Sequence, residues 1–264
     1  MLGLGNSIIS GAALEQAFTP SSIANLAIWY KFNTGITADA DASGSAVSHS
    51  TDAGNMADGD QIARWNDQSG NGNHAVQATA GDKPHWETDA ADLGGLKFDN
   101  TADMTFTAVN VNAEAAFTLV FRIKPIGFQS GGDVLIGDQS NDFFRMSSSA
   151  NFRIKMAAST PNNNNFNDAS NTLSTSVYST IILTRAAGAT GARKLYVKPS
   201  NASEIDWAST AGNEDADETS FSIIGSSTSG NNELNAFVKD VLIYNGTALD
   251  SGQRSNMYTY LENQ

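Results

Sequence analysis

The chain has 264 residues, with 15 lysines and arginines against 28 aspartates and glutamates, a formal net charge of −13 and no cysteine. This length suffices for one large all-β domain, and the lack of cysteine excludes disulfides, thiolate metal sites and thiol nucleophiles. The acidic balance argues against nucleic acid, because phosphates need clustered basic residues.

The first 22 residues have neither the period of a strand nor that of an amphipathic helix. Their apolar side chains are too many for a free tail and too few for a core; they are Leu2, Leu4, Ile8, Ile9, Leu14 and Phe18. We therefore predict an N-terminal assembly arm over residues 1–22, ordered by a partner or by another copy of the chain. The alternative is an arm that folds back over its own domain. The segment has no basic residue and is a poor secretory signal.

A first strand is expected within residues 23–33, where Leu26, Ile28, Tyr30 and Phe32 alternate onto one face. Residues 37–60 offer little to bury and predict a long exposed loop. Short strands separated by turn residues then follow at 62–66, 74–78, 96–98, 104–108, 117–124, 134–137, 143–146, 152–156, 177–185, 194–198, 204–208, 221–225 and 237–244. The four asparagines at 162–165 predict a mobile loop.

This succession of strands without βαβ spacing predicts an all-β domain over residues 23–264, a two-sheet antiparallel β-sandwich. In residues 117–124 the alternation predicts one buried face and one mostly wet face, which carries Arg122 and Lys124. The only substantial helix is expected near residues 250–262, with Asp250 or Ser251 as N-cap and Met257 and Leu261 facing inward.

Basic residues come close together at only two places in the sequence. Arg193 and Lys194 are expected in a loop, and Arg153 and Lys155 at a strand edge. Neither group makes a nucleic-acid surface, so we expect no nucleic-acid partner. No apolar run is long enough to span a bilayer, so we also expect no membrane insertion.

Several motifs resemble the laminin-G and pentraxin branch of the concanavalin-A-like jelly rolls. They are RWNDQSGNGNHAVQ from Arg64, KPHW, GGLKFDN, the strand FTLVFRIKP, and the ending FVKDVLIYNGTALDSGQRSNMYTYLE. The resemblance covers roughly residues 23–264 and implies a concanavalin-A-like jelly roll. The opening MLGLGNSIISG, leading into such a domain, resembles structural virion proteins of tailed phages of marine bacteria.

The Asp67 segment carries two alternative interpretations. Its Ser-Gly and Asn-Gly steps favour a tight turn in which Asp67 accepts backbone hydrogen bonds. Domains of the resembled branch often bind Ca²⁺ at loop ends, and Asp67 with Asn71 and Asn73 offers the oxygens that Ca²⁺ prefers. The turn is favoured because no bidentate glutamate lies nearby in the sequence. We expect no cofactor, with Ca²⁺ as the alternative.

Many jelly rolls of the resembled architecture are retaining glycosidases with the pattern Glu-x-Asp-x-x-Glu, whose working carboxyls lie about 5–5.5 Å apart. Here Glu204 and Asp206 match, but Ser209 stands where the proton donor belongs. The three histidines, His49 among them, form no catalytic motif. We therefore predict that the protein is not an enzyme. The acidic cluster Glu214, Asp215, Asp217 and Glu218 favours a solvated loop over a Ca²⁺ site.

Four tryptophans complete the candidate residues. Trp29 and Trp65 lie in apolar strands and are expected in the core. Trp86 beside His85, and Trp207 beside Asp206, are the surface candidates for stacking on a sugar, with core packing as the alternative. The first candidate function is a non-enzymatic virion subunit (head decoration, neck or fibre-associated) that contacts other virion proteins or itself and carries a lectin-like jelly roll for a host-surface glycan. The alternatives are a free carbohydrate-binding lectin and, more remotely, a glycan-cleaving enzyme.

Overall fold

The computed structural model describes residues 17–40, 46–51, 56–88, 94–112, 115–138, 142–157, 161–188, 192–207, 209–210, 219–227 and 232–264. Of the predicted arm, Leu2, Leu4, Ile8, Ile9 and Leu14 lie outside these ranges, as does the acidic cluster of residues 214–218. Within them, no helix combines the length and the apolar character needed to cross a membrane.

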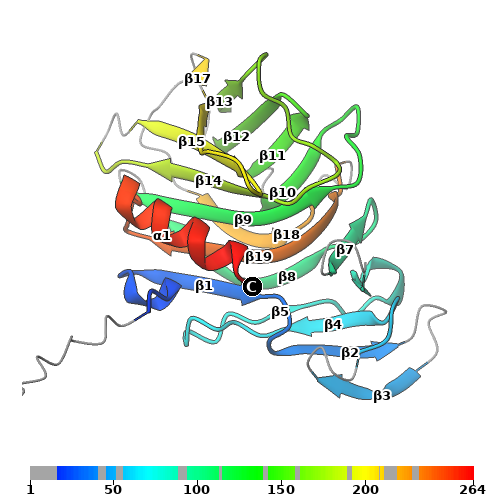
Figure 1. The fold of residues 1–264 in the computed structure, drawn as a ribbon. Coiled ribbons are helices and arrows are strands. Elements are labelled where there is room, and N and C mark those ends of the chain that lie inside the picture. The colour runs from blue at the N-terminus through cyan, green and yellow to red at the C-terminus, as the bar shows by residue number, and fades with distance from the viewer. Residues whose placement is uncertain are drawn as a thin grey trace, which may run out of the picture.

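The regular secondary structure of the described chain is mostly β-strand, with one α-helix at its end (Figure 1). The strands are β1 (Leu26–Lys31), β2 (Ile36–Ala40), β3 (Ala46–Thr51), β4 (Gln61–Trp65), β5 (Ala75–Val76), β6 (His85–Glu87), β7 (Gly95–Asp99), β8 (Met104–Val111), β9 (Phe117–Pro125), β10 (Asp133–Gly137), β11 (Phe143–Ser148), β12 (Asn151–Ala157), β13 (Pro161–Asn167), β14 (Ser179–Arg185), β15 (Arg193–Pro199), β16 (Ile205–Trp207), β17 (Ser209–Thr210), β18 (Thr219–Ile224) and β19 (Asn235–Asn245). The helices are α1 (Ser251–Glu262) and the 3-10 turns η1 (Pro20–Ser22) and η3 (Ala80–Asp82).

The strands form one continuous antiparallel sheet that folds over on itself, which corrects the prediction of two separate sheets. One half has the order β16-β15-β14-β9-β19, and β19 pairs further with β7 and β1. The other half runs β3-β2-β4-β5-β8-β18-β10-β11-β12-β13-β17. β6 joins the halves because it pairs with both β4 and β7. The result is sandwich-like and nearly closed.

The main core lies between the two halves of the sheet. Alternate residues of β9, among them Phe117, Leu119 and Phe121, point into it. The ring of Phe121 meets that of Phe144 from the opposite half, and Phe144 stacks on Phe152. Each such side chain contributes about 1.5–3 kcal/mol when its apolar surface leaves water. A β-bulge between Leu26 and Ile28 shifts the register of β1. Ile28 therefore joins the main core, whereas Leu26 packs on the other face of the sheet.

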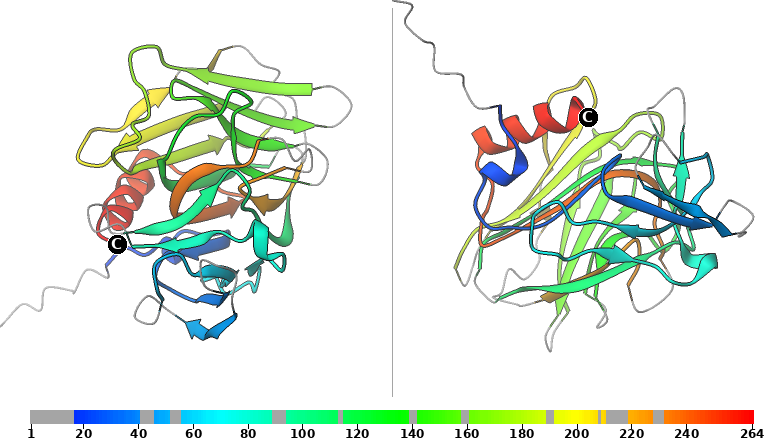
Figure 2. Two further views of the ribbon diagram at one scale, coloured as in Figure 1. Left: turned by 90° about the vertical axis from the view of Figure 1, so that its right-hand side faces the viewer. Right: turned by 90° about the horizontal axis from the view of Figure 1, so that it is seen from below.

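Helix α1 covers the outer face of the half that contains β9, β14 and β19 (Figures 1 and 2). Its Met257 and Leu261 are fully buried and form a second apolar cluster with Val120 and Ile182. The predicted helix and its Asp250 cap are thus confirmed. The prediction of a wet outer face on β9 is wrong, because all nine residues of the strand are buried.

Two stretches predicted as loops are strands. Residues 37–60 contain part of β2 and all of β3, because Ile36 and Ala38 supply a buried side to β2, which pairs with β4. The asparagine tract belongs to β13, which pairs with β12 along its whole length. Asn164 faces inward without exposure and accepts a hydrogen bond from the guanidinium of Arg193. A buried partner therefore compensates for the polar side chain.

The two basic groups also differ from their predicted positions. Arg193 begins strand β15 and is buried, so Arg193 and Lys194 are not in a loop. Arg153 and Lys155 lie on β12, which has a hydrogen-bonded neighbour on each side, so they are not at a sheet edge.

The start of the described chain packs against its own domain. The ring of Phe18 meets that of Tyr260 edge-on at 6.1 Å, and the backbone oxygen of Pro20 accepts a hydrogen bond from Tyr244 at 2.9 Å. Pro20 and Ile23 are buried. Of the predicted arm, the last residues therefore fold back, as the alternative interpretation held.

Candidate functional site

The tryptophans chosen as surface residues lie in the core, which corrects that prediction. Trp86 on β6 is 2% exposed and stacks on Phe32 with ring centroids 4.5 Å apart. Trp207 on β16 is 1% exposed and meets Phe152 edge-on at 5.1 Å. Neither ring presents a face on which a sugar could stack. Trp29 and Trp65 are buried, as predicted.

Their polar neighbours do not make a common site. His85 on β6 lies 3.7 Å from a carboxylate oxygen of Asp99, and its strand pairs with β4 and β7. Asp206 is exposed on β16, which pairs with β15. The sequence could not reveal this separation, because it depends on the order of strands in the folded sheet.

The Asp67 segment is a closely hydrogen-bonded turn. One carboxylate oxygen of Asp67 accepts from the backbone N–H of Trp29 at 3.0 Å and of Ser69 at 2.8 Å, and the other from the Ser69 hydroxyl at 2.7 Å and the Asn73 N–H at 3.1 Å. The amide nitrogens of Asn71 and Asn73 donate to backbone oxygens of the adjacent first strand. This geometry supports the turn interpretation. Among the described side chains, no three His, Asp or Glu residues gather as metal ligands.

Glu204, the first carboxylate of the glycosidase-like run, belongs to an ion pair with helix α1. Its two oxygens accept from Arg254 at 2.9 and 3.1 Å, and one also accepts from the Tyr258 hydroxyl at 2.6 Å. Burial raises the pKa of Glu204, but the hydrogen bonds and charge of these partners outweigh it and lower the pKa. The carboxylate is therefore ionised and occupied by partners of its own chain.

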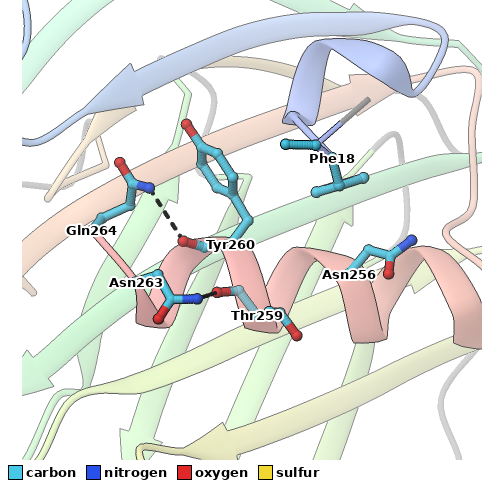
Figure 3. Close-up of a pocket in the computed structure, with 7 residues that line it drawn as sticks. Phe18, Asn256, Thr259, Tyr260, Asn263 and Gln264 are labelled. Atoms are coloured by element: carbon cyan, nitrogen blue, oxygen red, sulfur yellow. Dashed lines mark hydrogen bonds between the residues drawn. The ribbon is translucent and has the colours of Figure 1, made fainter. Parts of the chain in front are cut away.

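A small pocket lies on the other side of α1, between the helix and the start of the described chain (Figure 3). It has a volume of about 250 Å³, and its lining includes two aromatic side chains, three amides and a threonine. Its lining residues are Ala17, Phe18, Asn256, Thr259, Tyr260, Asn263 and Gln264.

Helical spacing brings the polar lining together, because Asn256 and Thr259 of α1 and the C-cap residue Asn263 stand three and four residues apart. The amide nitrogens of Asn263 and Gln264 donate to the helix's last carbonyls at 2.8 and 3.3 Å, which orients both side chains. The spacing of exposed amides was visible in the sequence. The aromatic partner Phe18 was not, because it lies far away along the chain.

The ring of Tyr260 contacts two residues of the first strand, β1. It meets Trp29 edge-on at 5.9 Å, and its hydroxyl accepts from the Lys31 ammonium at 3.4 Å. The pocket wall is therefore anchored to the sheet through two alternate residues of β1. Such support keeps a binding ring in one orientation before a ligand arrives.

The carboxylate of Asp240, on the neighbouring strand β19, is fully buried. Neither of its oxygens has a partner in hydrogen-bond geometry. Burial raises the pKa of Asp240 to about 7, although the Trp29 indole and the cations Arg122, Lys31 and Lys239 act in the opposite direction. The group therefore changes its charge near neutral pH.

Comparison with known proteins places the chain among lectin-like folds. Residues 98–253, more than half of the chain, match the family model described as the concanavalin A-like lectin/glucanases superfamily. A comparison with curated protein sequences gave no match.

Three solved structures illustrate the likeness. A mutant GH54 α-L-arabinofuranosidase soaked with 4-nitrophenyl α-L-arabinofuranoside is 13% identical with a TM-score of 0.57, over 90% of this chain and 62% of that one. A Trypanosoma rangeli sialidase in complex with sialic acid is 15% identical with a TM-score of 0.48, over 91% and 33%. Domain 4 of a GH43 extracellular arabinanase from Geobacillus stearothermophilus, in complex with arabinotriose, is 10% identical with a TM-score of 0.47, over 88% and 98%. The chain thus spans less than two thirds of the first two proteins, and at these identities the likeness concerns the fold.

Proposed function

Because this chain belongs to the concanavalin A-like lectin/glucanase superfamily, we propose that it is a non-catalytic carbohydrate-binding protein. The observation that carries the proposal is the pocket on α1, where the rings of Phe18 and Tyr260 stand among amide and hydroxyl groups. Aromatic rings stack on the C–H faces of sugars, and amides exchange hydrogen bonds with sugar hydroxyls. The volume of about 250 Å³ is below the range of about 300–1,000 Å³ typical of drug-sized ligands. It suits one sugar ring, such as the end of a glycan.

The geometry around Glu204 supports the non-catalytic part of the proposal. A retaining glycosidase needs a carboxylate free to attack the sugar and a second one to donate a proton. Both oxygens of Glu204 accept hydrogen bonds from Arg254 and Tyr258. The third carboxylate of the glycosidase pattern is missing, because Ser209 occupies its position.

The test measures binding of neutral mono- and oligosaccharides by NMR chemical-shift perturbation or calorimetry. We expect a ligand whose signals map to α1, and Asn256→Ala and Tyr260→Ala to weaken its binding about tenfold, near 1.4 kcal/mol. Ser255→Ala, also exposed on α1 but outside the lining, is the matched control and should bind like the native chain.

Three results would count against this proposal. Binding by both pocket variants at native strength would place the sugar elsewhere. A complete lack of binding across the panel would remove carbohydrate recognition. Hydrolysis of any tested glycan that disappears in Glu204→Gln would overturn the non-catalytic assignment.

A particle-bound role for the domain is a second proposal. We propose that residues 1–16 attach the jelly roll to an assembly, such as the head, neck or fibre of a virion, by contact with other subunits or further copies of the chain. Support comes from the apolar character of this segment and from the place where the described chain begins, since Phe18 packs against Tyr260 of α1 (Figure 3). The apolar residues are Leu2, Leu4, Ile8, Ile9 and Leu14.

Deleting residues 1–16 tests this attachment, because Phe18 and Pro20 remain to pack on the domain. We expect the melting temperature to stay unchanged while self-association in sedimentation, and incorporation into particles, are lost. A truncated protein that assembles normally, or one that melts at a lower temperature, would argue against an assembly segment.

A further inference from the structure

A row of polar side chains crosses the outer face of the sheet on the side that α1 covers. Lys31 of β1 lies opposite Asp240 of β19, which lies opposite Arg122 of β9. Arg122 lies opposite Thr180 of β14, and Thr180 opposite Lys198 of β15. Directly opposite residues of neighbouring strands point to the same face of a sheet. Asp240 is therefore the one carboxylate of a row that also contains three cations.

Arg122, the neighbour of Asp240 on one side, donates its hydrogen bonds away from the carboxylate. Its two terminal nitrogens donate to the hydroxyls of Thr180 and Ser200, both at 3.0 Å. Neither oxygen of Asp240 has a hydrogen-bond partner in the described structure. The register therefore brings Arg122 beside Asp240 without a hydrogen bond between them.

The other charged groups around the row also have contacts of their own. Lys198, at its far end, forms an ion pair with Glu262 of α1. Lys239, next to Asp240 on β19, has its ammonium 4.4 Å from the ring centroid of Tyr178. Lys31 is the remaining cation beside Asp240.

Lys31 is the member of the row that reaches the pocket on α1. Its ammonium donates to the Tyr260 hydroxyl at 3.4 Å and lies 5.8 Å from the ring centroids of both Trp29 and Tyr260. Figure 3 shows the Tyr260 ring standing out from α1 among the residues that line the pocket. A distance of 3.4 Å is long for a hydrogen bond. Lys31 therefore supports the pocket wall through a weak contact that a stronger partner can replace.

The Asp240 carboxylate is such a partner. Side chains directly opposite each other on an antiparallel pair have Cβ atoms about 4.5–5.5 Å apart, and the lysine stem is long and flexible. A fully buried charge is costly unless it is paired. An ionised Asp240 therefore attracts the Lys31 ammonium, whereas a protonated Asp240 leaves it with Tyr260.

We propose that Asp240 is a positioning residue that makes sugar binding in the α1 pocket depend on pH. When its carboxyl is protonated, Lys31 stays on Tyr260 and supports the ring. When the carboxylate is ionised, Lys31 moves toward β19 and the ring loses this support, so the sugar binds more weakly. This regulation rests on the proposed carbohydrate-binding function of the pocket, and Asp240 acts on the sugar only through Lys31 and Tyr260.

The pH range follows from the surroundings of the carboxyl. Burial raises the pKa of Asp240 to about 7, against the opposing effects of the Trp29 indole and of Arg122, Lys31 and Lys239. The carboxyl is therefore protonated below pH 7 and ionised above it, and affinity for the sugar falls as pH rises through this value. Linkage is reciprocal, so a bound sugar also raises the pKa of Asp240.

Calorimetry of the full chain with the methyl glycosides of glucose, galactose and mannose tests this dependence. We expect affinity for the glycoside that binds best to be about fivefold lower at pH 8 than at pH 5. Asp240→Asn should bind at both pH values with the strength of the native chain at pH 5. Asp103→Asn is the matched control, because the pKa of Asp103 is also raised but its neighbours are Gln77 and Asp82. This variant should keep the native pH dependence.

Lys31→Met separates positioning from a general effect on stability, because it removes the ammonium and keeps an apolar stem. It should bind about fivefold more weakly than the native chain at pH 5 and show no pH dependence. Opposite effects of Asp240→Asn and Lys31→Met on affinity would support the proposal. A native pH dependence in either variant, or equal weakening of both at every pH, would overturn it.

NMR of the sugar-free protein distinguishes this proposal from the function on which it rests. The signals of the Tyr260 ring and the Trp29 indole should shift with a midpoint near pH 7, and should stay constant in Asp240→Asn. Tyr260 signals that do not change with pH would overturn the coupling. If they shift but none of the glycosides binds, the carbohydrate function is wrong while the coupling of Asp240 to the pocket wall is supported.

Discussion

Glu204 directly precedes strand β16 and binds Arg254 and Tyr258 of helix α1. It therefore links the helix to this strand. The guanidinium of Arg254 also lies 3.6 Å from the ring centroid of Tyr196, and the Lys198 ammonium forms an ion pair with Glu262 near the helix end. Arg254 is 10% exposed and Glu204 30%, so solvent screens the pair only in part. A residue that resembles a nucleophile in the sequence thus has a structural role in the fold.

Glu204→Gln should therefore destabilise the protein. A glutamine side chain has one oxygen where the carboxylate has two, so it cannot accept all the hydrogen bonds that Arg254 and Tyr258 donate. The charge-assisted hydrogen bonds are also lost. We expect a loss of about 1–2 kcal/mol in the free energy of unfolding, measured by chemical denaturation. Asp206→Asn, two residues along and exposed, is the control and should leave stability unchanged. Equal stability of the two variants would mean that the ion pair contributes nothing.

Elements differ in how much of their structure is encoded locally. Helix α1 begins with a capping box, in which Asp250 accepts from the Gln253 N–H at 2.8 Å and the Gln253 side chain accepts from the Asp250 N–H at 3.0 Å. Strand β13 has no comparable local signal. It exists because β12 pairs with it and because Arg193 supplies a partner for Asn164.

Asp250→Ala should shorten or loosen the first turn of α1. Loss of an N-cap costs about 1 kcal/mol, so we expect a lower melting temperature and weaker protection of the Gln253 amide in hydrogen exchange. Ser251→Ala, exposed at the next position, is the matched control. An unchanged Gln253 amide would show that packing of Met257 and Leu261 alone holds the helix end.

At the scale of the whole molecule, two buried or half-buried carboxyls govern the expected dependence of stability on pH. The pKa of Asp240 is raised to about 7 by burial, and that of Asp103 to about 6 by burial and by the neighbouring Asp82. Both carboxyls hold a proton more tightly in the folded state than in the unfolded chain, where the pKa is about 3.9. Their contribution to stability is therefore complete below pH 4 and is lost as pH rises through 6 and 7.

We expect the protein to be about 4 kcal/mol less stable at pH 8 than at pH 5, as measured by urea denaturation at constant ionic strength. Asp240→Asn should remove most of this slope, whereas the exposed Asp206→Asn should retain it. A stability that rises between pH 5 and 8 would show that Arg122, Lys31 and Lys239 keep Asp240 ionised.

The sequence by itself determined the all-β class, most of the strands and helix α1, because alternating apolar residues and a helix cap are signals within a few neighbouring residues. Only the tertiary structure decided the joining of the strands into one sheet through β6, the burial of Trp86 and Trp207, and the position of β13. The pocket between Phe18 and Tyr260, the ion pair of Glu204 with Arg254 and the pairing of Lys31 with Asp240 also required it. Each of these depends on which strands or helices become neighbours, and contacts between residues far apart in the chain leave no local periodicity to read.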